Sequence, residues 1–263
     1  MALSVQDIKK ELEAAQVEML PQLIEKYKDD SRSGVIKLLE SAGKRIKALE
    51  AEKARIRELW MYEEKYSEFS VICGIDEAGR GPLAGPVVAG AVVLPKDCDI
   101  LYINDSKKLS EKKREELYDI IYEKSLCANV GIVGPERIDE INILQATYEA
   151  MRQAIEGLSI KPDLLLNDAV TIPDVNIRQV PIIKGDARSI SIGAASIIAK
   201  VTRDRIMREM DEKYPEYGFG GHKGYGCTAH IEKIEKIGPC PIHRRTFIKN
   251  FKIPDKSSWK YSS

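Results

Sequence analysis

The sequence predicts an α/β protein in which helices flank a mixed sheet, with a small helical extension at its N-terminus. Three observations lead to this prediction. Residues 1–68 are dominated by Ala, Leu, Glu, Lys and Arg and show no strand-like alternation. From residue 71 onward, short runs rich in Val and Ile alternate with longer helix-forming segments. Neither an internal repeat nor a low-complexity tract interrupts the pattern.

Two or three helices are expected in the extension. Val5–Gln16 consists of helix formers throughout, and the polar run 29–34 breaks the helix. Val35–Tyr66 then reads as one long charged helix with a single glycine. We place the domain boundary between residues 1–68 and 69–263, and we expect the second part to fold without the first.

The second part alternates strands and helices. Ser110 is well placed to cap one helix, and Pro135 and Gly157 suit the first turn and the end of another. The expected strands are Val71–Ile75, Val87–Leu94, Cys127–Val133, Asp163–Leu166 and Arg178–Lys184, and the expected helices are Glu111–Ser125, Pro135–Leu158 and Ser189–Tyr214.

The middle of the chain is acidic and its end is basic, although the whole chain is neutral. The 41 Lys and Arg residues balance 41 Asp and Glu residues, which excludes a globally basic coat for nucleic acid. Residues 71–199 carry 14 basic and 19 acidic residues, whereas residues 200–263 carry 14 and 8. This distribution is typical of an enzyme that binds metal with carboxylates and a polyanion with a basic flank. Chance variation in surface charge gives the same pattern, so the charge alone decides nothing.

Cysteine and histidine are too few and too scattered for a soft-metal site. The five cysteines form no C-x-x-C pair, and the chain has three histidines. A bound metal would therefore be a hard cation on oxygen ligands. The longest purely apolar or glycine run, Val87–Leu94, is far too short to cross a membrane, and we expect a cytoplasmic protein.

Four acidic residues stand at the ends of expected strands. Asp76 and Glu77 follow the first strand, Asp168 closes the fourth, and Asp186 follows the fifth after Gly185. Functional groups of α/β sheets collect at such ends. Carboxylates gathered from separate strands repel one another unless a cation lies among them, so these four are candidate catalytic residues and ligands for Mg²⁺ or Mn²⁺. A single acid at a strand end is more often a cap or a turn former.

Several other residues are candidates for substrate binding. Gly79-Arg80-Gly81 lets the backbone approach a ligand closely, although most such sequences are turns. Tyr225, among glycines in the basic region, can stack on a sugar or base, or else pack on the core. Arg203-Asp204-Arg205 is interpreted as a structural ion-pair network, and His243-Arg244-Arg245 as a candidate contact to a phosphate backbone. The candidate phosphate-binding residues are Lys107, Lys108, Lys184, Arg188 and Ser189.

The residues from Gly74 to Val88 resemble the opening signature of the ribonuclease HII family. Further stretches match that family in the same order over about residues 71–250. They are Asn104–Ser110, Ile138–Ile143, Ile183–Asp186, Ala194–Asp204 and His222–Gly226.

This resemblance implies a ribonuclease H-like fold and hydrolysis of RNA in RNA–DNA hybrids, with incision at single ribonucleotides in duplex DNA. Its four metal-binding acids fall on Asp76, Glu77, Asp168 and Asp186, with Mn²⁺ or Mg²⁺ as cofactor. Its element that senses the 2′-hydroxyl falls on Gly79, Arg80 and Gly81, and its junction-sensing tyrosine on Tyr225. The implied products carry a 3′-hydroxyl and a 5′-phosphate.

Two departures and two alternatives remain. Asn167 stands where the family usually has an apolar residue, and residues 1–70 lie outside its core pattern. No clamp-binding peptide is found, so no protein partner is inferred and a monomer is expected. A hybrid-binding module without activity would not keep four converging carboxylates, and a nuclease specific for DNA would have no use for a 2′-hydroxyl sensor.

Overall fold

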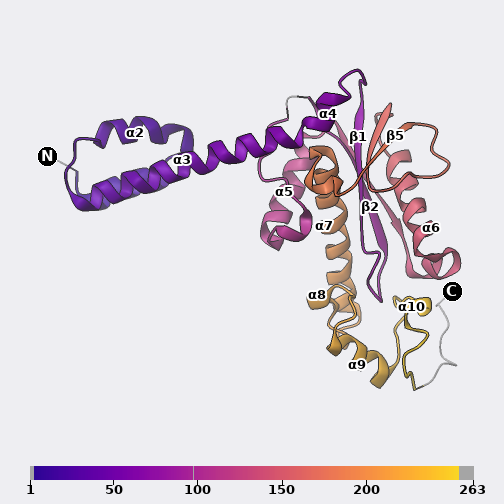
Figure 1. The fold of residues 1–263 in the computed structure, drawn as a ribbon. Helices are drawn as coiled ribbons and strands as arrows, with labels where there is room; N and C mark the ends of the chain where they lie inside the picture. Colours follow the sequence, from indigo (N-terminus) through magenta and orange to yellow (C-terminus); the bar gives the residue numbers. More distant parts are fainter. Residues whose placement is uncertain (1–2, 97, 255–263) are drawn as a thin grey trace. The chain divides into compact units, whose positions relative to one another are not determined.

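The computed structural model describes residues 3–96 and 98–254, and the chain divides into two compact units, Met1–Glu58 and Leu59–Ser263. Figure 1 labels the elements in chain order. Within the described residues, no helix is both long and apolar enough to cross a bilayer.

The N-terminal unit is helical, as expected. It contains α1 (Val5–Ala14), the short η1 (Val17–Met19), α2 (Leu20–Tyr27) and most of α3 (Ser33–Leu59). The Ser4 hydroxyl caps α1 by accepting a hydrogen bond from the Asp7 backbone N–H. The apolar faces of these helices share a small core built from Ile8, Leu12, Leu20, Tyr27, Val35 and Ala42.

The larger unit is built on a five-stranded mixed sheet with the order β3-β2-β1-β4-β5. β1 (Ile72–Ala78) pairs antiparallel with β2 (Val87–Val93), which pairs antiparallel with β3 (Cys127–Val133). On its other side β1 runs parallel to β4 (Leu164–Asp168), which runs parallel to β5 (Arg178–Ile182). The predicted α/β class is confirmed, but Asp76 and Glu77 lie inside β1 and do not follow it, because β1 extends to Ala78.

Two long helices cover the two faces of this sheet (Figure 1). α6 (Pro135–Glu156) packs on one face, where Ile75, Ala89 and Leu165 belong to its core. α7 (Ile190–Lys213) lies so close to the other face that a methyl group at Gly74 would lie 2.1 Å from the Ser191 carbonyl carbon. Glycine at that position is therefore required by packing.

The helix predicted over Pro135–Leu158 is interrupted at Asn142. This residue has a φ of 68° and a ψ of 163°, so the helix is kinked there. The Asn142 side chain accepts hydrogen bonds from the backbone N–H groups of Leu144 and Gln145 and thus caps the second segment. The remaining elements are α5 (Glu111–Lys124), α8 (Phe219–His222), α9 (Thr228–Ile237), α10 (Arg245–Ile248), η2 (Ser106–Lys108) and η3 (Gly185–Ala187).

The predicted single helix over Val35–Tyr66 is also divided, and its last part belongs to the larger unit. α4 (Met61–Lys65) and the residues after it place Tyr62, Tyr66 and Phe69 against a core formed by β4, β5 and α7. Glu63 is buried, and its Oε1 accepts hydrogen bonds from the Ser189 hydroxyl (2.6 Å) and the Ser191 N–H (3.0 Å). The two compact units therefore divide near residue 58, inside the extension predicted over residues 1–68, whose boundary stays a prediction.

Two truncations test this boundary. We expect a chain beginning at Leu59 to unfold cooperatively, because it keeps α4. A chain beginning at Phe69 should have an unfolding free energy at least about 3 kcal/mol lower than that of the chain beginning at Leu59. It lacks two packed tyrosines and the Glu63 hydrogen bonds. Urea denaturation followed by circular dichroism measures the difference, and equal stability of the two chains would contradict the assignment of α4.

Candidate active site

The sheet register brings three of the four predicted acids to one edge. Ile75 lies opposite Asn167 on the neighbouring parallel strand, so Asp76 and Asp168 follow side by side. Glu77 is the next residue of β1, and it faces Arg80 at 3.3 Å. The electrostatic coupling of both β1 acids to Asp168 places the three carboxylates in one group.

Asp186 joins this group through the turn after β5. Lys184 adopts a left-handed conformation with a φ of 57°, and Gly185 and Asp186 begin η3. The Gly185 N–H donates to Asp168 Oδ1 at 2.7 Å, which ties this turn to the end of β4. A larger residue at 185 would collide with Ile192, whose Cδ1 would lie 2.6 Å from its Cβ.

Burial and mutual repulsion raise the pKa values of three of these acids. The pKa of Asp76, which is 5% exposed, is raised well above its usual value by burial first and then by Glu77 and Asp168. Burial also raises the pKa of Glu77, although Arg80 and Lys107 counteract it. The pKa of Asp186 is raised by burial and then by Asp105 and Asp168. The group therefore carries more negative charge than the protein alone neutralises.

Lys107 is a second cation, besides Arg80, that faces these acids. Burial lowers its pKa, but the carboxylates of Asp105, Asp76 and Asp186 raise it, and the net shift is upward. Asp105 was not among the predicted site residues, although it lies in Asn104–Ser110, one of the stretches that resemble the family. Its side chain accepts from the Lys107 backbone N–H and caps η2, which holds Lys107 at the site.

The donor set fits a hard divalent cation. Asp76, Glu77, Asp168 and Asp186 offer only oxygen, and their uncompensated charge favours a cation among them. In the part of the chain that the structure describes, no three acidic, His or Cys side chains already enclose an ion position. The carboxylates are thus close in the fold, but among the described residues they do not form a complete coordination site.

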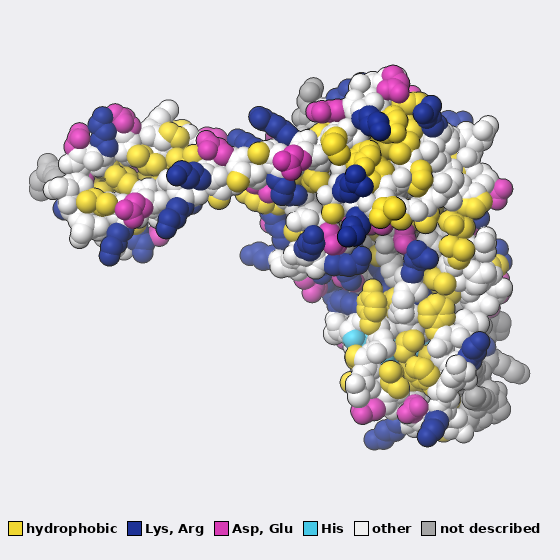
Figure 2. All heavy atoms as spheres, in the orientation of Figure 1, with side chains coloured by type: hydrophobic (Ala, Val, Ile, Leu, Met, Phe, Trp, Pro, Cys, Tyr) yellow, Lys and Arg dark blue, Asp and Glu magenta, His cyan; other side chains and the backbone are white. Residues whose placement is uncertain are grey.

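A pocket of about 460 Å³ adjoins the carboxylates. Figure 2 shows Lys and Arg side chains gathered around acidic ones in the middle of this face of the larger unit. Five basic residues line the pocket with one acid, so it suits an anion. The lining residues are Glu77, Ala78, Gly79, Arg80, Gly81, Ser106, Lys107, Arg114, Ser196, Lys200, Arg203 and Tyr225.

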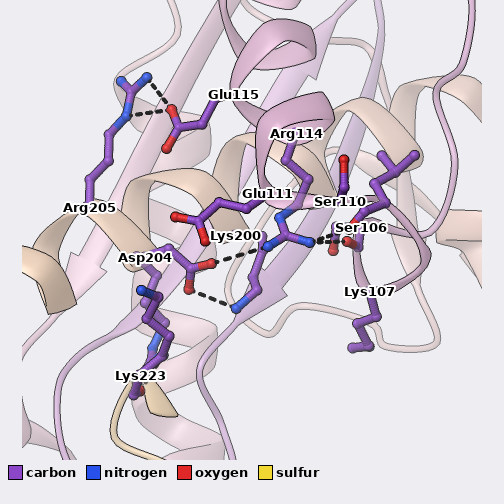
Figure 3. Close-up of polar contacts among 12 residues, drawn as sticks. Ser106, Lys107, Ser110, Glu111, Arg114, Glu115, Lys200, Asp204, Arg205 and Lys223 are labelled. Atoms are coloured by element: carbon purple, nitrogen blue, oxygen red, sulfur yellow. Dashed lines mark hydrogen bonds and ion pairs between the residues drawn. The ribbon is translucent and has the colours of Figure 1, made fainter. Parts of the chain in front are cut away.

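Two of these basic residues, Arg114 and Lys200, were not predicted. Both face the buried Asp204, with Lys200 Nζ 2.7 Å and Arg114 Nη2 3.7 Å from its carboxylate (Figure 3). Arg205 pairs with Glu115 on α5, so the predicted ion-pair network is correct for Asp204 and Arg205. The prediction is wrong for Arg203, because its guanidinium donates only to backbone carbonyls and forms no ion pair with another described residue.

The Gly79-Arg80-Gly81 element and Tyr225, both predicted to contact the substrate, lie together at this pocket. Gly79 has a φ of 96°, a conformation that favours glycine. A methyl group at Gly81 would lie 3.9 Å from the ring of Tyr225, which is 46% exposed. The tyrosine ring is therefore free to contact a ligand and is not a core residue.

All three histidines support the segment that carries Tyr225. His222 bonds to the Tyr217 carbonyl through Nε2. His230 Nδ1 lies 2.9 Å from the Tyr225 carbonyl oxygen and donates to it, since a carbonyl only accepts. His230 Nε2 then accepts from His243 Nε2 at 3.0 Å. The exposed Cys227 follows this segment at the start of α9.

Some predicted residues lie away from the pocket lining. Lys108, Lys184 and Arg188 are exposed but do not line it. Ser189 is fully buried, caps α7 and donates to Glu63, so its position does not fit a phosphate contact. Arg188 stacks its guanidinium over Tyr62 at 5.2 Å.

The structure also bears on two other points of the sequence, the His243-Arg244-Arg245 segment and Asn167. His243 and Arg244 are buried, so the expected contact with a phosphate backbone is wrong for these two residues, whereas the half-buried Arg245 leaves it untested. Asn167 is buried and donates to Gln179 and the Val170 carbonyl, so it supports the turn after β4 and does not contact the carboxylates.

Comparison with known proteins gives a consistent result. The family model described as ribonuclease HII matches residues 73–250, and its N-terminal domain model matches residues 4–67. Ribonuclease HII of Lachnoclostridium phytofermentans is 60% identical over 250 residues, covering 95% of this chain and 98% of the relative. That of Acetivibrio thermocellus is 51% identical, with the same coverage of each chain.

Solved structures agree with these relatives. Ribonuclease H2 from Pyrococcus horikoshii aligns with a TM-score of 0.57 and 33% identity, covering 67% of this chain and 93% of that one. The PCNA–RNase HII complex from Archaeoglobus fulgidus aligns with a TM-score of 0.57 and 29% identity, covering 70% and 97%.

The buried histidines predict loss of stability in acid. Burial, the largest cause, lowers the pKa of His230 to about 4 and that of His243 to about 3. The unfolded chain, with histidine pKa values near 6.5, therefore binds protons first as the pH falls. The stabilisation is complete above about pH 6.5 and is lost toward about pH 4, with about 2 kcal/mol lost per histidine at pH 5. Urea denaturation at pH 7 and pH 5 measures it.

His243→Gln is the matched control, because the glutamine amide keeps a donor toward His230 and does not titrate. Its stability should fall less between pH 7 and pH 5 than that of the unsubstituted chain. An identical pH dependence in both proteins would show that other groups cause the acid sensitivity.

Proposed function

Because this chain belongs to the ribonuclease HII family, and is therefore a type 2 ribonuclease H that hydrolyses the RNA strand of RNA–DNA hybrids, we propose that it also incises duplex DNA on the 5′ side of a single embedded ribonucleotide. One observation supports this proposal above all. The Gly79–Gly81 turn, the exposed ring of Tyr225 and the carboxylate Glu77 line the same pocket. The turn and the tyrosine can therefore contact the sugar that lies next to the cleaved phosphodiester bond.

We assign the hydrolysis to two Mn²⁺ or Mg²⁺ ions held by Asp76, Glu77, Asp168 and Asp186. When bound, such ions activate a water molecule and stabilise the leaving oxygen of a phosphodiester. The products carry a 3′-hydroxyl and a 5′-phosphate. The raised pKa values of Asp76, Glu77 and Asp186 support the assignment, because a group of repelling carboxylates is stabilised by a cation.

The chain's own residues bind and orient the substrate. Lys107, Arg80 and Lys200 present positive charge to the pocket and suit the phosphates that flank the cleaved bond. The backbone at Gly79–Gly81 can hydrogen-bond a 2′-hydroxyl, which DNA lacks. Tyr225 supplies a face on which the adjacent sugar or base packs. Lys108, Lys184 and Arg188 extend the positive surface outside the pocket.

The metal assignment predicts the behaviour of Asp76→Asn. The variant should cleave at least about a hundredfold more slowly in Mg²⁺ or Mn²⁺, since it loses a ligand charge. Without metal it should be at least as stable as the unsubstituted chain, because a buried charge and its repulsion disappear.

Two measurements check this prediction. Cleavage of a labelled duplex with one ribonucleotide gives the rate. Thermal denaturation with and without Mn²⁺ gives the stabilisation by metal, which the variant should lose. Cleavage near the unsubstituted rate would exclude Asp76 as a metal ligand.

The role of Tyr225 predicts a substrate-dependent loss. Stacking on a sugar or base is worth about 1–3 kcal/mol, so Tyr225→Ala should lower kcat/KM by about one to two decades. The loss should be larger on a single embedded ribonucleotide than on a long hybrid, where neighbouring sugars offer other registers. Tyr225→Phe should recover most of it if stacking dominates.

Tyr122→Ala is the control, because Tyr122 is an exposed tyrosine on α5 that does not line the pocket. It should leave kcat/KM on both substrates unchanged. Equal losses of Tyr225→Ala on the two substrates would remove Tyr225 from the sensing of the ribonucleotide.

A further inference from the structure

Two buried arginines, Arg203 in the lining of the pocket and Arg244 outside that lining, have no ion-pair partner among the described residues. Arg203 is 1% exposed and Arg244 is fully buried. Their guanidinium groups repel each other, and burial is the main cause that lowers the pKa of Arg244 to about 9. Burying two cations is costly unless every donor is satisfied. Here each of the three nitrogens of both guanidinium groups donates one hydrogen bond to a backbone carbonyl.

Arg244 binds the loop that begins with Gly79-Arg80-Gly81. Its Nη2 donates to the Gly79 carbonyl at 2.5 Å, and its Nη1 donates to the Arg80 carbonyl at 2.9 Å. Its Nε donates to the Gly85 carbonyl at 2.9 Å. One planar guanidinium thus holds both ends of the loop.

These bonds fix the direction of two peptide groups. In a planar trans peptide the carbonyl and the N–H point in opposite directions. Because Arg244 holds the Gly79 and Arg80 carbonyls on the buried side, the N–H groups of Arg80 and Gly81 point away from it. Gly79 is buried whereas Arg80 and Gly81 are exposed, in agreement with this orientation. No acceptor for these two N–H groups is found among the residues that the structure describes.

Arg203 joins the same loop to the segment of Tyr225. Its Nε and Nη2 donate to the carbonyls of Pro86 and Ala84, each at 3.0 Å. Its Nη1 donates to the Lys223 carbonyl, also at 3.0 Å. Gly79 packs directly on this side chain, since a methyl group there would lie 2.1 Å from Arg203 Nε. The guanidinium also lies 5.9 Å from the centre of the Tyr225 ring.

We propose that Arg244 and Arg203 are positioning residues for the discrimination of ribose from deoxyribose. Arg244 aims two free backbone N–H donors at the sugar, and Arg203 fixes their distance from Tyr225. Neither side chain needs to touch the substrate. This inference rests on the proposed incision at single ribonucleotides, and it extends the predicted 2′-hydroxyl sensor to the residues that orient it.

Arg244→Lys and Arg203→Lys test the inference. Lysine keeps the positive charge but offers one nitrogen, so it cannot hold three carbonyls in fixed directions. Arg205→Lys is the matched control, because Arg205 lies on the same helix as Arg203 but pairs with Glu115 outside the loop. Thermal denaturation establishes that each variant is folded.

Two readouts separate positioning from a general structural role. The first is kcat/KM on a duplex with one ribonucleotide relative to kcat/KM on a long RNA–DNA hybrid. The second is the ratio of the Kd for an all-DNA duplex to the Kd for the duplex with one ribonucleotide, measured in the Asp76→Asn background to prevent cleavage. We expect both lysine variants to lower each ratio at least about tenfold, and Arg205→Lys to leave them unchanged.

The outcomes are distinguishable. Equal losses on both substrates, with an unchanged Kd ratio, would overturn the positioning role and leave the proposed function intact. If one lysine variant fails to fold, the other decides; if both fail, the arginines serve stability alone and the inference is overturned. If the unsubstituted protein cleaves the long hybrid but not the single-ribonucleotide duplex, the proposed function fails and the inference fails with it.

Discussion

The close contact between α7 and the sheet is the constraint on which the site depends. The Ser191 backbone lies against Gly74, and the Ala195 carbonyl lies against Gly90, where a methyl group would be 2.5 Å away. From this fixed position, α7 directs Ser196 toward Asp76 and Arg203 toward the Gly79 loop. A side chain at either glycine would displace the helix and disturb both the carboxylates proposed to bind metal and the loop that begins at Gly79.

Charge is separated across the pocket. On one side, the carboxylates of β1, β4 and η3 repel one another and raise their own pKa values. On the other side, two buried guanidinium groups repel each other and are satisfied only by carbonyl groups. The protein thus holds charges of both signs at one site, the carboxylates disfavoured by burial and by one another, and the guanidinium groups hydrogen-bonded to backbone carbonyls.

Local sequence predicted the strands well but missed one local break in a helix and the features that depend on distant contacts. Cys127–Val133 was predicted without error because apolar residues and a following glycine mark its limits. The kink at Asn142 was missed, because its side-chain cap lies within a run that otherwise favours helix. Ser189 looked like an anion-binding helix start, and only the fold reveals that Glu63, 126 residues away in sequence, occupies that position. The three histidines were likewise too far apart in sequence to suggest one network.

The exposed thiol of Cys227 offers a practical consequence. Cys73, Cys98 and Cys127 are buried and Cys240 is partly covered, whereas Cys227 is exposed two residues after Tyr225. A maleimide dye should therefore react there first, without any engineered cysteine. Attached beside the tyrosine, such a dye would report the arrival of a nucleic-acid duplex as a change in fluorescence.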